Sequence, residues 1–237
     1  GPPKAVMLSH RNLAWTADIA AEMINLSSED CTLSYLPLSH IAEQMFTIHS
    51  PINVGSQVYF FSDEKEKFPQ YLQDVQPTIF FGVPRVWEKL HAGITGALSQ
   101  ATGVKAKLAA WALRVGSEVN LKRNHGETVG GVLGLKYKLA NKLIYSKIKT
   151  KIGLGRAKIC VSGAAPVSKE VLEFFAGLDV VVHEVYGQSE DTGPTSFNLP
   201  GATRYGTVGK PIPGMDVRIA EDGEIQARGP NVCMGYF

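Results

Sequence analysis

The sequence has 237 residues, of which 44% are hydrophobic and 19% are charged, and its formal net charge is +2 at pH 7. A chain of this length buries a substantial core and forms one large domain or two modest ones. The net charge is too small to indicate a nucleic-acid partner. No apolar run approaches the roughly 20 residues of a membrane-spanning helix, and the first ten residues do not form a signal peptide.

The three cysteines, Cys31, Cys160 and Cys233, are widely spaced along the chain. An odd number at such spacing indicates neither a disulfide framework nor a metal site. We therefore expect small buried thiols and a reducing compartment, the cytoplasm.

The first 152 residues alternate between helical and extended patterns. Apolar residues recur at helical spacing after Ser9 and Asn12, either of which can cap the predicted helix. The segment 40–55 is typical of a buried helix, and we expect Pro51 and Gly55 to end it. We expect further helices over residues 68–77, 85–98, 104–124 and 133–152, and strands over residues 31–38, 57–61 and 78–84.

The remaining residues continue this alternation and then become β-rich. A strand over 158–163 precedes a helix over 167–178 that Ser168 can cap, and the run VVVHEVYG predicts another strand. From Gly201 onward short extended segments alternate with Gly/Pro turns, and Asp222-Gly223 predicts a hairpin. The fold class is therefore α/β, with mostly parallel sheets flanked by helices over 1–200 and a β-rich C-terminal portion over 201–237.

Two segments have the order strand, polar loop, helix that builds ligand crevices at the carboxyl ends of parallel strands. They are CVSGAAPVSKE and VVVHEVYGQSEDTG. In the second, Tyr186 offers a flat face, Ser189 can hydrogen-bond a phosphate oxygen, and Glu190 or Asp191 can hold a hard cation such as Mg²⁺. A tight connection and a solvated polar loop remain the alternative interpretations of the two segments.

Three further features carry weaker signals. The opening GPPK resembles the end of a phosphate loop, but Lys4 is followed by Ala5 and so departs from the Walker A pattern. His40 lies at a predicted strand-to-helix junction, where a structural role is the alternative. The lysine-rich run 136–158, with Leu139, Leu143, Ile144, Ile148 and Ile152 at helical spacing, predicts an amphipathic helix with a solvated face. Attraction to anionic lipid, and thus peripheral membrane contact, is its alternative.

Several motifs together resemble the AMP-forming acyl-CoA synthetases, a family of adenylate-forming enzymes. GPPKAVMLSHRN resembles the second half of that family's phosphate loop. YLPLSHIAEQ, FFGVPRVWEKL, SGAAPVS, EVYGQSE, GTVGKPIPG and GEIQARGPNVCMGYF follow in the family's order. The resemblance spans virtually the whole chain. FGVPRVWEKL and EFFAGLDVVVHEVYGQSE are most similar to the long-chain branch, particularly the bubblegum-type fatty-acid synthetases.

The resemblance implies a set of site residues. Tyr186 would stack on adenine, Ser189 would bond the α-phosphate and Glu190 would coordinate Mg²⁺. His40 would lie near the acyl carboxylate, and Lys4, Ser189, Glu190 and His40 form the implied catalytic set. The implied nucleotide-binding residues are Gly1, Pro2, Pro3, Lys4, Gly163, Ala164, Ala165, Pro166, Glu184, Val185, Tyr186, Gly187, Gln188 and Ser189. Candidates for the acyl-pocket wall are Val182, His183 and residues 206–208. The role of Asp191 stays open.

The function that the resemblance implies is long-chain fatty acid–CoA ligation, with fatty acid, ATP and coenzyme A as substrates and Mg²⁺ as the metal. Because the chain starts in a loop and stops after a Gly-rich strand, we expect a partial large N-terminal domain that lacks the small C-terminal domain and is inactive alone. A ligase that passes its acyl group to a carrier protein and a non-catalytic nucleotide- or lipid-binding remnant are the alternatives. The sequence leaves acyl chain length and oligomeric state open.

Overall fold

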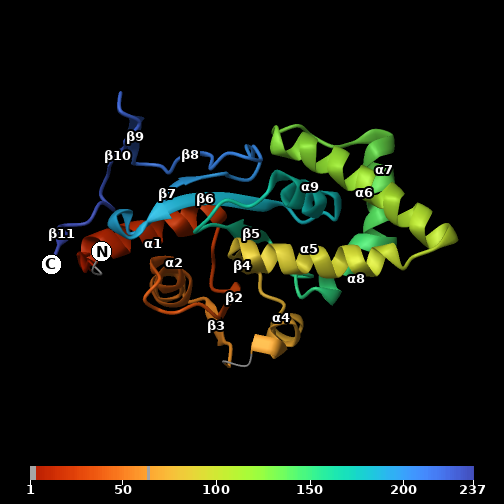
Figure 1. The fold of residues 1–237 in the computed structure, drawn as a ribbon, viewed down its shortest axis with the longest axis horizontal. Coiled ribbons are helices and arrows are strands. Elements are labelled where there is room, and N and C mark those ends of the chain that lie inside the picture. The colour runs from red at the N-terminus through yellow and green to blue at the C-terminus, as the bar shows by residue number, and fades with distance from the viewer. Residues whose placement is uncertain (1–3, 63–64) are drawn as a thin grey trace.

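The computed structural model describes residues 4–62 and 65–237. Its centre is a five-stranded sheet in the order β4-β5-β6-β7-β8, with helices gathered at both ends and over its faces (Figure 1). Strands β4, β5 and β6 are parallel, whereas β7 and β8 are antiparallel to their neighbours. The central strands are β4 (Ile79–Gly82), β5 (Ile159–Ser162), β6 (Val182–Gln188), β7 (Gly193–Phe197) and β8 (Lys210–Pro211).

The other described strands form three separate pairs. The parallel pair β2 (Cys31–Ser34) and β3 (Gln57–Phe60) flanks the sheet. The predicted hairpin at Asp222-Gly223 is confirmed as β9 (Asp216–Ile219) and β10 (Ile225–Arg228). β1 (Val6–Met7) pairs with β11 (Gly235–Tyr236), so the two ends of the chain lie side by side (Figure 1).

The described helices occupy the positions that the apolar spacing predicts. α1 begins after Ser9, whose Oγ accepts the Asn12 N–H at 3.1 Å while Asn12 Oδ1 accepts the Ser9 N–H at 2.9 Å. This reciprocal pair is a capping arrangement that satisfies free amides at the helix start. Ser168 likewise caps α9. The helices are α1 (His10–Ile24), α2 (Ile41–Gln44), α3 (Ser50–Val54), α4 (Phe68–Val75), α5 (Pro84–Ser99), α6 (Gly103–Asn124), α7 (Gly131–Ala140), α8 (Ser146–Lys151) and α9 (Lys169–Gly177), with the 3₁₀ turn η2 (Lys65–Lys67) before α4.

Two predicted helices differ from expectation because each contains a π-helical turn. Pro51 does not end the helix over 40–55. Instead α2 runs through η1 (Met45–His49) into α3, which has Pro51 in its first turn and ends at Gly55. The proline is accommodated inside this continuous helix by the π-turn that precedes it, and the Thr32 hydroxyl donates to the Phe46 carbonyl within that turn at 3.2 Å. The second π-turn, η3 (Asn141–Tyr145), joins α7 to α8.

The expected helix after the VVVHEVYG strand is also wrong. β6 leads instead into the short 3₁₀ turn η4 (Ser189–Asp191) and returns as the antiparallel strand β7. The polar residues of this segment therefore form the end of a β-hairpin. Its sequence lacks the apolar spacing of a helix, and Gly193 at φ +117° allows the chain to turn back.

Two apolar clusters cover the two faces of the sheet. One contains Phe80, Trp87 and Phe175 from β4, α5 and α9, with the Trp87 ring in edge contact with both phenylalanines. The other contains Phe81, Val161 and Phe197, with α1 and the η1 turn packed against it. Cys31 and Cys160 are buried free thiols, as expected, whereas Cys233 is only partly buried. Burial raises the pKa of Cys160 to about 12, so this thiol is not a nucleophile.

Candidate functional site

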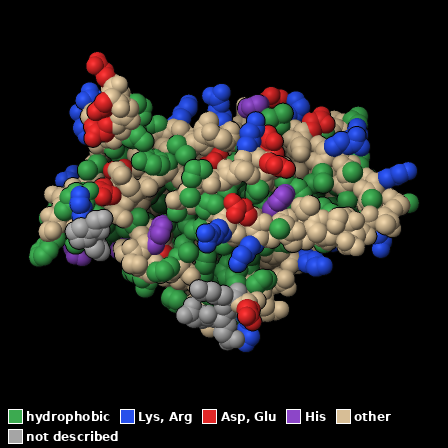
Figure 2. Space-filling model, viewed as in Figure 1, with side chains coloured by type: hydrophobic (Ala, Val, Ile, Leu, Met, Phe, Trp, Pro, Cys, Tyr) green, Lys and Arg blue, Asp and Glu red, His purple; other side chains and the backbone are tan. Residues whose placement is uncertain are grey.

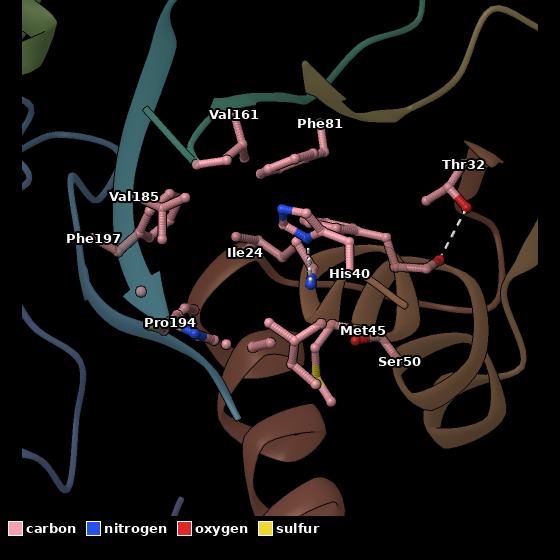
Figure 3. Close-up of a pocket in the computed structure, with 18 of the residues that line it drawn as sticks. Ile24, Thr32, His40, Met45, Ser50, Phe81, Val161, Val185, Pro194 and Phe197 are labelled. Atoms are coloured by element: carbon pink, nitrogen blue, oxygen red, sulfur yellow. Dashed lines mark hydrogen bonds between the residues drawn. The ribbon is translucent and has the colours of Figure 1, made fainter. Parts of the chain in front are cut away.

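A cavity of about 370 Å³ lies at the carboxyl ends of β4, β5 and β6. Its apolar wall is built by α1, by the α2–η1 helix and by the sheet (Figure 3). Polar groups reach it from His40 and from the end of β6. The wall includes Ala20, Met23, Ile24, His40, Met45, Phe46, Phe81, Val161, Ala164, Val185, Gly187, Gln188, Ser189 and Phe197. Its size and largely apolar lining are typical of a small-molecule site.

His40 is placed at the mouth of this cavity by the start of α2. It is the N-cap residue, and its Nδ1 accepts the Ala42 N–H at 3.2 Å. The imidazole extends into the cavity between Phe81 and Ile24 (Figure 3). The predicted strand-to-helix junction is therefore correct, and the cap bond fixes the ring so that Nε2 remains available to a bound molecule.

The end of β6 brings small and polar residues against the same cavity. Val185, Gly187, Gln188 and Ser189 line it, and the strand is interrupted by a bulge between Tyr186 and Gly187. A Cβ atom at Gly187 would overlap the Gly193 carbonyl. Glycine is therefore required where β7 crosses closest to β6.

Two other residues of β6 lie away from the cavity. Tyr186 is half-buried and pairs with Ser196 of β7, and strand alternation places it on the face opposite Val185. The buried carboxyl of Glu184 accepts the Gly206 N–H at 3.1 Å. Burial raises the pKa of Glu184, and the Gly206 bond opposes that rise.

The connection from β5 to α9 forms the next part of the rim. Gly163 is buried against Val185, whereas Ala164, Ala165 and Pro166 are exposed. Ala164 has φ +70° and lines the cavity. The small side chains leave this backbone open to a flat ligand, and the left-handed Ala164 marks a turn that the packing around it enforces.

Glu190 and Lys4 meet through the pairing of the chain ends. Glu190 Oε1 accepts the Tyr236 hydroxyl at 2.7 Å, and the Glu190 carbonyl accepts the Cys233 N–H at 2.7 Å. Lys4 Nζ lies 4.9 Å from the centre of the Tyr236 ring. The Tyr236 hydrogen bond first, and the charge of Lys4 as a smaller cause, lower the pKa of Glu190. A half-buried carboxylate near a lysine fits a site for a hard cation and phosphates. Gly1, Pro2 and Pro3 lie outside the described residues.

Asp191, whose role the sequence left open, is buried and hydrogen-bonded in the structure. It is 2% exposed, and its Oδ2 accepts hydrogen bonds from the Thr195 hydroxyl and from Gln188 Nε2. The Asp191 carbonyl accepts Asn231 Nδ2 at 2.8 Å. These bonds hold the turn that presents Ser189 and Glu190, so Asp191 orders the turn from behind.

The residues expected to line an acyl pocket lie elsewhere. Val182 is fully buried in the cluster around Trp87. His183 lines a second cavity of about 290 Å³, which lies at the amino ends of β5 and β6, and residues 206–208 do not line the larger cavity. Sequence reasoning instead missed the wall from α1 and the α2–η1 helix. Their only signal is the apolar face that each helix turns toward the sheet.

Within the described ranges, no group of three or more His, Cys, Asp or Glu side chains converges as a metal site. Among these residues, too, no helix has the length and hydropathy needed to cross a membrane.

Comparisons with known proteins agree with the motifs and the fold. The family model described as AMP-binding enzyme matches residues 1–237. The long-chain-fatty-acid–CoA ligase ACSBG2 of Xenopus laevis is 41% identical over 248 residues, which cover 100% of this chain and 33% of that protein. The chain thus spans about a third of this relative's length.

Solved structures show the same fold. Apo MatB from Rhodopseudomonas palustris matches with a TM-score of 0.67 at 21% identity, over 100% of this chain and 38% of that one. A malonyl-CoA ligase in complex with methylmalonyl-CoA and AMP matches with a TM-score of 0.62 at 26% identity, over 100% and 42%. The expected resemblance to AMP-forming acyl-CoA synthetases and the α/β fold class are confirmed. The chain belongs to the family of AMP-binding enzymes.

Proposed function

We propose that the whole protein containing this chain is a long-chain fatty acid–CoA ligase, which activates a fatty acid with ATP and transfers the acyl group to coenzyme A. The observation that carries the proposal is the meeting of an apolar cavity with the polar end of β6 at His40 and residues 187–189. An alkyl chain fits the first environment and a nucleotide fits the second. The fatty-acid–CoA ligase named among the relatives supports the same substrate class.

The nucleotide is assigned to the rim of this cavity. The open backbone at 163–166 and the Gly187 segment are suited to a flat base, because both lack bulky side chains on the cavity side. Ser189 is exposed at the first position of η4, where its hydroxyl is free to bond a phosphate oxygen. Lys4 and Glu190, brought together through Tyr236, would hold the phosphates and Mg²⁺. The ion would neutralise charge on the phosphate oxygens.

The chemistry that these residues serve is two displacements. In the first, the fatty-acid carboxylate attacks the α-phosphorus of ATP and pyrophosphate leaves. In the second, the coenzyme A thiol attacks the acyl carbon and AMP leaves. The protein's part is to hold two anions in line while water is excluded. His40, at the cavity mouth with Nδ1 engaged, would position the acyl carboxylate as a hydrogen-bond donor.

The compartment is a further part of the proposal. The free thiols of Cys31, Cys160 and Cys233 support a reducing, cytoplasmic location.

The cavity assignment is tested by Ala20→Trp in the whole protein. Ala20 lines the cavity from α1, so an indole there occupies the space assigned to the alkyl chain. We expect kcat/KM for a long-chain acid to fall about ten-fold or more, with a smaller loss for a short acid. Fatty-acid-dependent ATP–pyrophosphate exchange measures this. Ala21→Trp, on the same helix but outside the cavity wall, is the matched control.

One result would contradict the cavity assignment, and another would contradict coenzyme A as the acyl acceptor. Unchanged exchange with long acids in Ala20→Trp would remove the alkyl chain from this cavity. Exchange without any acyl transfer to coenzyme A, but with transfer to a carrier protein, would favour the ligase alternative in which the acyl group goes elsewhere.

A further inference from the structure

The charge of the chain is divided unequally between two regions. Residues 103–151, which form α6, α7 and α8, contain eleven Lys or Arg and two Glu, a net charge of +9. The remaining residues contain thirteen Lys or Arg and twenty Asp or Glu, a net charge of −7. The small overall charge therefore combines a basic helical lobe at one end of the molecule with an acidic remainder. Lys and Arg side chains are spread over the surface of this lobe (Figure 2).

α7 has apolar residues on two faces. Its inner face is accounted for, because Leu133, Tyr137 and Ala140 pack with α6 in one cluster. Its outer face carries Val132, Leu135 and Leu139, whose exposed fractions are 69%, 68% and 51%. These three recur at i, i+3 and i+7, so they share one stripe of the helix surface.

Lysines surround this outer stripe. Lys136, Lys138 and Lys142 are exposed, and each follows a member of the stripe by three or four residues, which places it beside that member. Residues 128–169 contain no Asp or Glu. Among the residues that the structure describes, no ion pair joins Lys136, Lys138 or Lys142 to an acidic side chain.

Leu139 and the isoleucines that follow it lie on different faces of the helix. The sequence places Leu139 in one apolar series with Ile144 and Ile148, but spacings of five and nine residues put it on nearly the opposite side of a helix with 3.6 residues per turn. Ile144 and Ile148 pack inward, whereas Leu139 faces out. The expectation of one buried stripe along 136–158 is therefore wrong for Leu139.

We propose that the outer face of α7, formed by Val132, Leu135 and Leu139 with Lys136, Lys138 and Lys142, docks on the surface of an anionic lipid bilayer. An apolar stripe beside lysines fits the interface, since the apolar side chains enter the headgroup boundary and the ammonium groups pair with lipid phosphates. A nucleic acid would use the lysines but leave three apolar side chains in water. A second copy would bring two basic lobes of net charge +9 together, which repel each other.

The test is co-sedimentation of the 237-residue chain with vesicles of phosphatidylcholine, with and without phosphatidylglycerol. We expect binding to the anionic vesicles alone, and release when salt near 1 M shortens the Debye length to about 3 Å. K136Q/K138Q/K142Q should weaken partition about 100-fold, since each lysine contributes roughly a five-fold factor near an anionic surface. L135Q/L139Q should weaken it about ten-fold or more.

The matched controls remove the same number of lysines, or of large apolar side chains, from surfaces outside the basic lobe. K89Q/K169Q/K210Q and I219Q/I225Q remove exposed residues outside the basic lobe and should bind as the unaltered chain does. Circular dichroism melting establishes that every variant is folded.

Several outcomes would overturn the proposal. The unaltered chain could fail to bind anionic vesicles at low salt, or both face variants could bind as well as the controls. If the lysine variant alone loses binding and L135Q/L139Q keeps it, the face is a general polyanion site and does not dock on lipid. A dimer in sedimentation velocity that L135Q/L139Q dissociates would assign the face to a second copy.

Discussion

At the scale of single residues, the candidate site depends on side chains that hold the candidate metal ligand, Glu190, in place by hydrogen bonds. The Glu190 carboxylate is fixed by the Tyr236 hydroxyl, and the turn that carries it is fixed by the buried Asp191. These two acids are adjacent and chemically alike, yet Glu190 is only half-buried whereas Asp191 is fully buried among hydrogen-bond donors. Burial and partners therefore separate a candidate metal ligand from a structural carboxylate, and the sequence GQSED does not contain that information.

His183 gives a residue-scale prediction for the pH dependence of stability. Its Nδ1 lies 2.9 Å from the Asn198 carbonyl in a buried setting, and burial lowers its pKa from 6.5 to about 4. Between these values the unfolded chain takes up a proton that the folded chain does not, so stability present above pH 6.5 is lost as pH falls toward 4. The loss attributable to His183 is at most about 3 kcal/mol.

The measurement is urea unfolding of the chain from about pH 8 to pH 4.5. His183→Gln should flatten the decline relative to the unaltered chain, because glutamine does not titrate. Parallel declines in the two proteins would contradict the buried neutral imidazole. Comparing the two proteins cancels the contribution of the carboxyl groups common to both.

At the scale of elements, the closest helix crossing gives a second prediction. α6 and α9 make contact at Gly116, where an added Cβ would overlap the Gly177 carbonyl. Gly116→Ala should therefore destabilise the fold by about 1–3 kcal/mol despite alanine's better helix propensity, because backbone must move. Gly96→Ala in α5, with no atom within 4 Å of its Cβ position, should instead stabilise by up to about 1 kcal/mol.

Denaturant unfolding of both variants tests this contrast. Equal gains in the two would mean that the α6–α9 crossing is looser than the structure describes. Equal losses would mean that helix propensity does not govern the exposed site in α5. Opposite signs follow only if the close approach at Gly116 is real.

Helices and strands could be predicted from the sequence where a single apolar periodicity, of 3.6 or of 2 residues, runs without interruption. The α1 cap at Ser9, the α9 cap at Ser168 and the hairpin at Asp222-Gly223 follow from local chemistry, and the structure has each of them. The two π-turns have no such local signal, since MFTIH and NKLIY differ little from ordinary helix. The interruptions of the two helices were therefore not predictable from the sequence.

At the scale of the whole molecule, the site is assembled from distant parts of the chain. Lys4 lies over the ring of Tyr236, the hydrogen-bond partner of Glu190, because β1 pairs with β11. The apolar cavity closes because α1 and the α2–η1 helix pack on the sheet. The order of the sequence motifs indicated the loops expected to bind the nucleotide. No sequence motif marks the cavity that is proposed to hold the alkyl chain. Its wall is made of ordinary apolar residues whose meeting depends on tertiary packing. The sequence could therefore indicate the polar half of the site and not the apolar half.

In the proposed function, Glu190, with Lys4 close by, serves the use of Mg·ATP by the whole protein. Fatty-acid-dependent ATP–pyrophosphate exchange tests it most directly in Glu190→Gln, with Glu224→Gln on the exposed hairpin as the matched control. We predict that kcat/KM for Mg·ATP falls by the equivalent of about 1–3 kcal/mol in Glu190→Gln, the scale of one charge-assisted contact, while the control keeps the rate of the unaltered protein. An unchanged rate in Glu190→Gln, or equal losses in the two variants, would contradict the claim.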